Sequence, residues 1–323
     1  MAASQDKNQS LTNNVRRIIA FLLILIGFIW FGTIILPKHY ADSALPVPQI
    51  QASAFLGAIT LITGIGLLRS FRRALIILII AMLSVVLIPR VPMPFQSAHK
   101  PTTRVMSLNT FFAHADDRII AQKVTEISPD ILILIETNPE EVAAIAEHTG
   151  YTALNEAQPG GGASAVVTLV SAPYLEKLQR DNTWTFTMVD NMTIAQMPQL
   201  ELAQGTRIVG VHPVAPLLAN GTNKLWSNEL ESLARWAHST RQQQSNNADL
   251  VLLGDFNSTR AHPQYRELGL ADCTGHLAHK PTWPQTLPVI RIDHILSTAR
   301  CADGGTVNVQ GTDHLGVWAD VEL

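Results

Sequence analysis

The polar residues best suited to chemistry follow a short apolar run in the last third of the chain. Residues 250–254 predict a buried strand, and Asp255 and Asn257 stand at its end. On an extended backbone, residues two apart point to the same side, so a carboxylate that accepts a proton would lie beside an amide that donates to an oxyanion. The alternative for an isolated Asp-Phe-Asn segment is a strand followed by an Asx-type turn.

Further polar residues lie at the ends of other apolar runs or, in one case, within a run. Each alone is typical of a helix cap, a turn or a satisfied polar group, but together they form a set of acids, amides and imidazoles. Carboxylate and amide oxygens are the ligands that Mg²⁺ or Mn²⁺ prefers, and no cluster of His and Cys indicates zinc. The set comprises Asn109, Glu136, His212, the pair Asp293 and His294, and the pair Asp313 and His314.

Alternating strand and helix patterns after residue 102 predict the elements that carry these residues, in a layered α/β arrangement. Asn138 caps a helix that has Pro139 at its first position. The glycines at 160–162 lack the Lys and Ser/Thr of a P-loop and predict a plain turn. We expect helices at 116–127, 139–148 and 226–243, and strands at 104–109, 131–135, 163–170, 183–190, 193–202, 207–212, 250–255, 291–297, 306–310 and 317–323.

The first 90 residues differ in composition from the rest. The 323 residues are 47% hydrophobic and 15% charged, which is too apolar for an ordinary soluble chain, and the excess precedes Arg90. Residues 1–17 are polar and predicted to be disordered. The uncharged runs at 18–36, 50–68 and 74–88 predict three transmembrane helices within 18–89. A cleaved signal peptide is the alternative for the first run, and a buried core hairpin for the other two.

Glycines and arginines refine this membrane prediction. Gly57, Gly64 and Gly66 in the second run would let helices approach closely in lipid. Arg16 and Arg17 precede the first run, and three arginines separate the second from the third, so the positive-inside rule places the N-terminus in the cytoplasm. A multi-pass protein of the plasma membrane results, with everything after Arg90 on the outer side.

A proline-containing linker at 90–101 leads to a single predicted domain at 102–323. Outside the cytoplasm, Cys273 and Cys301 could be oxidised to each other, although two unpaired thiols are almost as compatible with the sequence. The formal net charge of −3 does not suggest tight binding to duplex nucleic acid.

The ordered set of motifs resembles the endonuclease/exonuclease/phosphatase superfamily, the deoxyribonuclease I-like proteins, over residues 104–323. The segments that carry the resemblance are Gly254-Asp255-Phe256-Asn257, Arg291 to Leu296, and Thr312-Asp313-His314. The membrane-anchored bacterial members are the most similar. The resemblance implies a four-layered α/β/β/α sandwich, preceded here by the three transmembrane helices, with the site at one end of the sheets.

The resemblance also implies a role for each residue. Glu136 would hold the divalent cation, Mg²⁺ or Mn²⁺, with Asn109 and Asp313 beside it. Asp255 would position or deprotonate the attacking water, and Asn257 would donate to a phosphoryl oxygen. His314, held in its tautomer by Asp293, would contact the phosphate or act as a base, and His212 would assist the leaving group. Phe111 stands where some relatives have an acid, and no carboxylate partner of His212 is evident.

We therefore expect a membrane-anchored, metal-dependent phosphodiesterase or phosphatase, with the lipid bilayer as a partner and a lipid-linked or small phosphoester favoured as substrate. An extracytoplasmic nuclease acting on DNA or RNA is the enzymatic alternative, and a catalytically silent binding module is the alternative of a different class. Phe112, Trp184 and Trp226 could line the approach to the site, although large aromatic residues are more often core. No protein partner is inferable.

Overall fold

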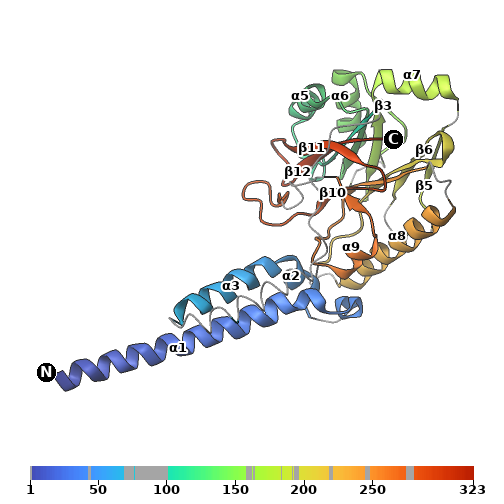
Figure 1. Cartoon of the computed structure of the whole chain (residues 1–323). Coiled ribbons are helices and arrows are strands. Elements are labelled where there is room, and N and C mark those ends of the chain that lie inside the picture. Colours follow the sequence, from blue (N-terminus) through green and yellow to red (C-terminus); the bar gives the residue numbers. More distant parts are fainter. Residues whose placement is uncertain are drawn as a thin grey trace. The chain divides into compact units, whose positions relative to one another are not determined.

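A computed structural model describes residues 2–42, 45–68, 76, 101–157, 162, 164–182, 184–190, 192, 196–217, 221–243, 248–273 and 280–323. The chain divides into two compact units. Unit 1 comprises Met1–Arg90 and Arg260–Arg266, and unit 2 comprises Val91–Thr259 and Glu267–Leu323. Figure 1 labels their elements.

Unit 1 contains one described helix that is long and apolar enough to cross a membrane, at Leu11–Ile35, so the prediction of three transmembrane helices was wrong. The second predicted run is divided at Ser53, whose hydroxyl donates to the carbonyl of Gln49 at 2.8 Å and so competes with the helical backbone. The third predicted run lies outside the described residues, apart from Ile76. The helices are α1 (Ala2–Gly32), η1 (Thr33–Ile35), η2 (Lys38–Asp42), α2 (Val47–Ala52) and α3 (Ala54–Leu67).

Helix α1 begins at Ala2, so the first residues are helical rather than disordered as predicted. They contain neither Gly nor Pro, and an adjoining apolar helix spares them the cost of nucleation. Helices α1 and α3 approach so closely that a Cβ added to Gly57 would lie 2.7 Å from the nitrogen of Phe31, and one added to Gly64 would lie 2.8 Å from the oxygen of Ala20. The predicted packing role of these two glycines is confirmed, whereas Gly66 has no neighbour within 4 Å.

Unit 2 is built on two described sheets of six strands each. Sheet A has the order β11-β12-β1-β2-β4-β3, and sheet B has the order β5-β6-β7-β8-β10-β9. Sheet A comprises β1 (Thr103–Asn109), β2 (Ile131–Ile135), β3 (Thr152–Ala153), β4 (Val166–Val170), β11 (Cys301–Asn308) and β12 (Leu315–Val321). Sheet B comprises β5 (Thr185–Met188), β6 (Pro198–Glu201), β7 (Arg207–Val211), β8 (Leu250–Asp255), β9 (Ala271–Asp272) and β10 (Asp293–Ser297).

Alternation along strand β2 shows how the layers are held together. Ile131, Ile133 and Ile135 belong to the core between the sheets, together with Val251 and Leu253 of sheet B. The residues between them, such as Leu132, face the opposite way and pack with side chains of the helices α5 (Asp117–Ile127) and α6 (Pro139–Thr149). Strand β2 therefore contributes to two cores.

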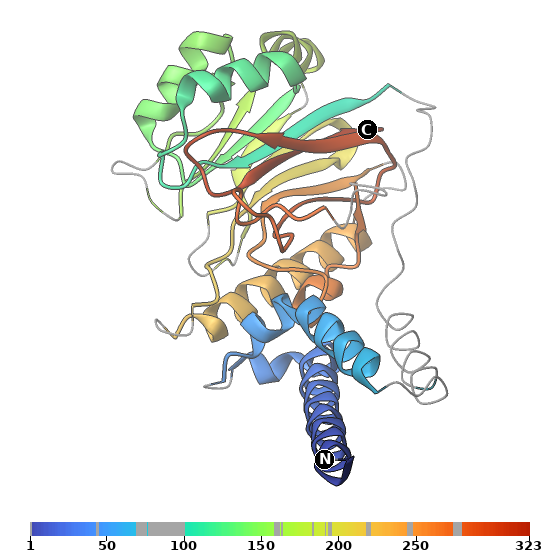
Figure 2. The same ribbon diagram turned by 90° about the vertical axis from the view of Figure 1, so that its left-hand side faces the viewer.

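Helices cover both outer faces of this pair of sheets, and Figure 2 shows α5 and α6 in green above the sheets and the helix at 223–243 in gold below them. Helix α8 (Asn223–Gln243) lies along sheet B, and its Trp226 donates to the carbonyl of Asn257 at 3.0 Å. The order helix, sheet, sheet, helix is the predicted four-layered α/β/β/α sandwich. Helix α7 (Ala172–Asp181), which was not predicted, also belongs to unit 2, and α9 (Pro263–Glu267) spans the boundary between the units.

The strand directions bring the predicted polar residues to one end of the sandwich. Strand β1 is parallel to β2, with Asn109 paired to Ile135, and β7 is parallel to β8, with Val211 paired to Gly254. Strand β10 is antiparallel to β8, so Asp293 at its start pairs with Asp255 at the end of β8. Gly254 is required here, because a Cβ at this position would lie 2.0 Å from the carbonyl oxygen of Val211.

A disulfide joins the two sheets, which settles the question that the sequence left open. Cys273 follows strand β9 of sheet B, Cys301 begins strand β11 of sheet A, and their Cα atoms lie 5.3 Å apart. Cys273 is buried in the core between the sheets. The bridge therefore closes a loop that includes strand β10 and its site residue Asp293.

Cys301→Ala should lower the free energy of unfolding by roughly 3 to 4 kcal/mol. The bridge joins two residues that are 28 positions apart in the sequence, and it therefore restricts the unfolded chain. Urea denaturation followed by circular dichroism measures this loss. A reductant should reproduce it in the wild type and have no effect on the variant. Identical unfolding midpoints for oxidised and reduced wild type would contradict the role of the bridge.

Candidate active site

The centre of the site is a contact between the ends of the two parallel strand pairs. The side-chain amide of Asn109, the last residue of strand β1, donates to Glu136 Oε1 at 3.2 Å and to Asp255 Oδ2 at 3.1 Å. Glu136 follows β2 and Asp255 ends β8, so one amide links residues of both sheets. His212, which follows β7, is also near: its Nε2 lies 3.5 Å from Glu136 Oε1 and 3.9 Å from Asp255 Oδ2. Four strand ends thus meet at one buried point.

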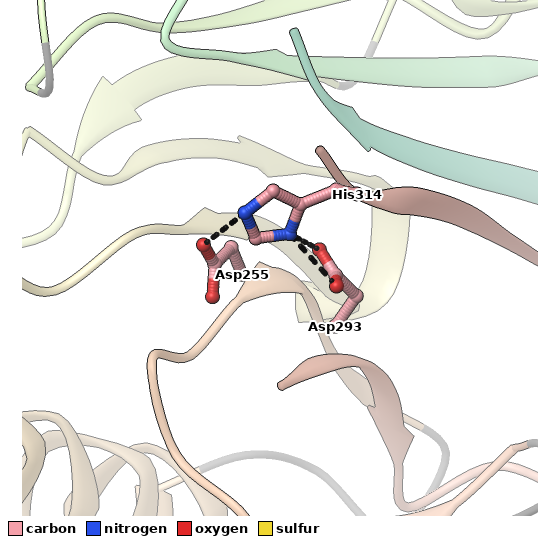
Figure 3. Close-up of side chains that lie close together, drawn as sticks. All are labelled: Asp255, Asp293 and His314. Atoms are coloured by element: carbon pink, nitrogen blue, oxygen red, sulfur yellow. Dashed lines mark hydrogen bonds and ion pairs between the residues drawn. The ribbon is translucent and has the colours of Figure 1, made fainter. Parts of the chain in front are cut away.

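His314 lies between the carboxylates of Asp255 and Asp293, as Figure 3 shows. Its Nδ1 is 3.0 Å from Asp293 Oδ2 and 3.2 Å from Oδ1, while its Nε2 faces Asp255 Oδ2 at 3.7 Å. Asp255, Asp293 and His314 are all buried, and each offers a ligand atom within 4.8 Å of the others. They are a group of residues that could hold a metal ion.

Burial and charge shift the acidities in this group. Burial by itself lowers the pKa of His314, but the negative charges of Asp293 and Asp255 outweigh it and raise the pKa to about 10. Burial raises the pKa of Asp255 to about 6, and the positive charge of His314 acts in the opposite direction. Burial also raises the pKa of Glu136, against the hydrogen bond from Asn109 and the charge of His314. His314 is therefore an imidazolium near neutral pH.

Asn257 and Asp313 lie at the edges of the site. Asn257 has a left-handed backbone with φ of 46°, so the expectation that it continues an extended strand beside Asp255 was wrong. Its N–H donates to Asp255 Oδ1 at 2.7 Å, which is the Asx-type turn, and its side-chain amide donates to the carbonyl of Pro213 at 3.0 Å. Asp313 Oδ2 accepts from Trp283 Nε1 at 2.9 Å, and its Oδ1 is 3.7 Å from His314 Nε2.

Strained backbone is concentrated around these residues. Among the described non-glycine residues with positive φ, Glu136, Asn257 and the consecutive residues 111–113 are all in loops of the site. The N–H of Ala113 donates to the carbonyl of Glu136 at 2.9 Å, and the N–H of Phe111 donates to Asn109 Oδ1 at 2.9 Å. These hydrogen bonds hold the conformation that aims Asn109 and Glu136 at each other.

A buried carboxyl behind the site was not identified from the sequence. Glu141 Oε2 accepts hydrogen bonds from Thr110 Oγ1 at 2.8 Å and Thr137 Oγ1 at 2.6 Å. Thr110 directly follows Asn109, and Thr137 directly follows Glu136. An acid in the first turn of a helix is expected there for its favourable interaction with the helix dipole, so the sequence offers no sign of this second role. Trp283, the partner of Asp313, was also missed, because an isolated Trp carries no pattern.

His294, the neighbour of Asp293, is not part of the site. Strand alternation directs it to the other face, where its Nδ1 lies 3.3 Å from Asp272 and its Nε2 3.0 Å from the carbonyl of Ser258. It is fully buried, and burial lowers its pKa. Its role is structural.

Comparison with protein families matches residues 106–314 to the Endonuclease/Exonuclease/phosphatase family. The chain belongs to this family, and its two mixed sheets with flanking helices form the deoxyribonuclease I-like α/β fold. It is a hydrolase that acts on phosphoester bonds, and this class of enzyme uses divalent metals. Membership of the family favours an enzyme over the silent binding module.

Several solved structures are similar to this chain, and no curated protein sequence matches it. A humanised TDP2 from D. rerio is 14% identical, with a TM-score of 0.49 over 69% of this chain and 99% of the other. An AP endonuclease from Archaeoglobus fulgidus is 15% identical, with a TM-score of 0.49 over 68% and 100%. A family protein from Bacteroides thetaiotaomicron is 12% identical, with a TM-score of 0.46 over 70% and 96%.

Glu141→Gln should change how stability depends on pH. Burial raises the pKa of Glu141 from 4.5 to about 7, so the native state holds this proton more tightly than the unfolded chain. The wild type therefore loses stability as pH rises through that window, by on the order of 3 kcal/mol, whereas the amide does not titrate. Urea denaturation should show that the free energy of unfolding of the variant, relative to wild type, is higher at about pH 8 than at about pH 4 by this amount. Glu140→Gln, at an exposed neighbour, is the control and should follow wild type. If Glu141→Gln differed from wild type by the same amount at both pH values, the assignment would be contradicted.

Proposed function

We propose that this protein is a phosphoesterase that uses Mg²⁺ or Mn²⁺, is anchored in the plasma membrane and carries unit 2 outside the cytoplasm. Its substrate is a phosphodiester or phosphomonoester, with a lipid-linked or small compound favoured. The observation that carries this proposal is the meeting of Asn109, Glu136, Asp255 and the Asp293–His314 pair at one buried point.

The residues present fit a hard divalent cation. Asp313 Oδ1 is a buried oxygen without a hydrogen-bond partner among the described residues, and burial raises the pKa of Glu136 because it disfavours the charged form. Glu136 would hold the ion and Asp313 would contribute a carboxylate oxygen, because such oxygens suit Mg²⁺ and Mn²⁺. Asn109 would lie beside the ion and orient Glu136, since its amide N–H faces Glu136 and its oxygen accepts from the N–H of Phe111. When bound, the ion would neutralise charge that develops on the phosphoryl oxygens.

The chain's own residues would orient the substrate and move protons. Asp255, whose pKa burial raises to about 6, would accept a proton from the attacking water, because a base is most effective with a pKa near the working pH. His314, held through Nδ1 by Asp293, would present its other N–H to a phosphoryl oxygen as a cation. That pKa of about 10 favours this contact over the role of base.

The other two side chains would act at the periphery of the reacting group. His212, within 4 Å of Glu136 and Asp255, would assist departure of the leaving group. Asn257 has one N–H engaged by Pro213, so its second amide N–H would donate to a phosphoryl oxygen.

Two features support the placement outside the cytoplasm. The Cys273–Cys301 disulfide would persist in an oxidising compartment and be reduced in the cytosol. The helix at Leu11–Ile35 could cross a bilayer, and Arg16 and Arg17 near its start favour a cytoplasmic N-terminus. An extracytoplasmic nuclease is the second candidate, and the net charge of −3 counts against it because duplex binding depends on basic residues.

Asp255→Asn should reduce hydrolysis of a p-nitrophenyl phosphodiester by roughly 10²- to 10⁴-fold, the range for loss of a general base. The melting temperature should change little, because burial already disfavours the charged form of Asp255. Asp272→Asn is the matched control: it breaks the buried contact with His294 and should lower the melting temperature without abolishing activity. Retained activity in Asp255→Asn would refute the assigned role.

Mg²⁺ or Mn²⁺ should raise the melting temperature of the full chain in detergent, by an amount that corresponds to about 2.7 kcal/mol at one hundred times the dissociation constant. Glu136→Gln should abolish most of this rise, because it removes the principal ligand charge. Differential scanning fluorimetry with increasing metal, and with EDTA as the reference, measures the effect. The same rise in wild type and Glu136→Gln would contradict a metal site at Glu136.

A further inference from the structure

The exposed apolar side chains of unit 2 are unevenly distributed. Among its described residues, six large apolar side chains are exposed, and five of them are in three loops at the end of the sandwich that holds the site. The sixth, Met188, is on the edge strand β5. The five are Phe111 (39% exposed), Phe112 (48%), Leu217 (51%), Leu287 (71%) and Val289 (45%), here called the apolar rim.

Each loop of the apolar rim is fixed to a residue of the site. Phe111 and Phe112 follow Asn109, and the N–H of Phe112 hydrogen-bonds Glu136, which lowers the pKa of that carboxyl in opposition to its burial. Leu217 is in the loop that begins at His212, and the carbonyl of Pro213 in this loop accepts from Asn257.

The third loop, which carries Leu287 and Val289, is bound on both sides to the acids of the site. Trp283 donates to Asp313 Oδ2 at 2.9 Å, and the N–H of Gln285 donates to the carbonyl of Asp313 at 2.6 Å. The N–H of Asp293 donates to Thr282 Oγ1 at 3.2 Å. Whatever covers this apolar loop therefore lies next to the segments that carry Asp313 and Asp293.

The turn at 111–113 keeps two aromatic rings in water at a conformational cost. Phe111, Phe112 and Ala113 all have φ between 54° and 56°, and bulky residues rarely adopt this left-handed conformation. The rings of Phe111 and Phe112 lie 5.7 Å apart, edge to face. A strained turn that exposes two aromatic rings beside a catalytic site is expected where the rings contact a ligand.

We propose that the apolar rim contacts the hydrocarbon chain of a lipid phosphoester in the bilayer surface, so that the scissile phosphate enters between Asp255 and His314. This inference rests on the proposed function and narrows its substrate to a lipid. Burying exposed apolar surface against acyl chains is favourable by about 25 cal/mol per Å². The apolar helix at Leu11–Ile35 in the same chain would keep the domain at such a surface.

The composition of the rim distinguishes lipid from single-stranded nucleic acid. Bases stack on aromatic rings and need basic residues along the backbone path. Three of the five rim residues, Leu217, Leu287 and Val289, are aliphatic and have no ring on which a base could stack. The loop residues 110–115, 212–217 and 283–290 contain no Lys or Arg, and aliphatic side chains are instead suited to acyl chains.

The test uses the full chain reconstituted in phosphatidylcholine nanodiscs with Mg²⁺, and two p-nitrophenyl phosphodiesters that differ only in the second alcohol, methyl or hexadecyl. Wild type should prefer the hexadecyl ester in kcat/KM by roughly ten-fold or more, because the added chain contacts the rim. The double variant Leu217→Ser, Leu287→Ser should lose most of this preference. Met188→Ser, at an exposed apolar residue outside the three loops, should retain both the preference and the activity.

The outcomes separate the two proposals. Hydrolysis of neither ester by folded wild type would overturn the proposed function and this inference together. Equal rates on both esters in wild type, or a preference unchanged in the double variant, would overturn the inference alone. If Val289→Ser and the double variant weaken cleavage of a single-stranded oligonucleotide and leave the ester preference intact, the rim serves nucleic acid and the inference is wrong. Unchanged melting temperatures verify that the variants are folded.

Discussion

The site depends on one hydrogen-bonded contact, in which the Asn109 amide joins Glu136 of sheet A to Asp255 of sheet B. Burial raises the pKa of both carboxyl groups, because it disfavours their charged forms. The positive charge of His314 and hydrogen bonds from the Asn109 amide and from backbone N–H groups offset only part of this effect. The same imbalance makes the position suitable for a divalent cation, because an ion of two positive charges would replace this partial compensation.

The position of that contact follows from the topology rather than from local sequence. The carboxyl ends of parallel strands coincide, so β1 with β2 and β7 with β8 each deliver two polar residues to one edge. Antiparallel β10 then brings Asp293 from the opposite chain direction to the same level as Asp255. Asp293 in turn orients His314, which completes the site.

The loops around the site combine strain with rigid support. Left-handed conformations at Glu136 and residues 111–113 are unfavourable alone, and they persist because several hydrogen bonds fix each loop. Glu141 contributes from behind, through the hydroxyl groups that follow Asn109 and Glu136. This arrangement costs free energy of folding. It also holds the reacting groups in position before a substrate binds, and such preorganisation raises the catalytic rate.

A family with this fold carries its chemistry at the ends of strands and its specificity in the loops beyond them. Here the chemistry and the apolar rim share the same loops, so that recognition of an apolar group and alignment of the phosphate would be coupled. The disulfide across the sheets and the apolar helix of unit 1 are consistent with work at the outer surface of a membrane.

The order of apolar runs and of the polar residues after them was sufficient to predict a layered α/β arrangement and the capped helix at Pro139, because periodicity and strand ends are local properties. The four layers and the candidate site residues were expected from the resemblance to the family. The number of membrane helices was not predictable, since the break at Ser53 depends on a side-chain hydrogen bond that hydropathy does not register. Nor were Glu141 and Trp283, or the turn at Asn257. Glu141 contacts Thr110, Trp283 contacts Asp313 and the turn at Asn257 is held by Pro213, and only the tertiary structure decides these contacts because folding brings distant segments together.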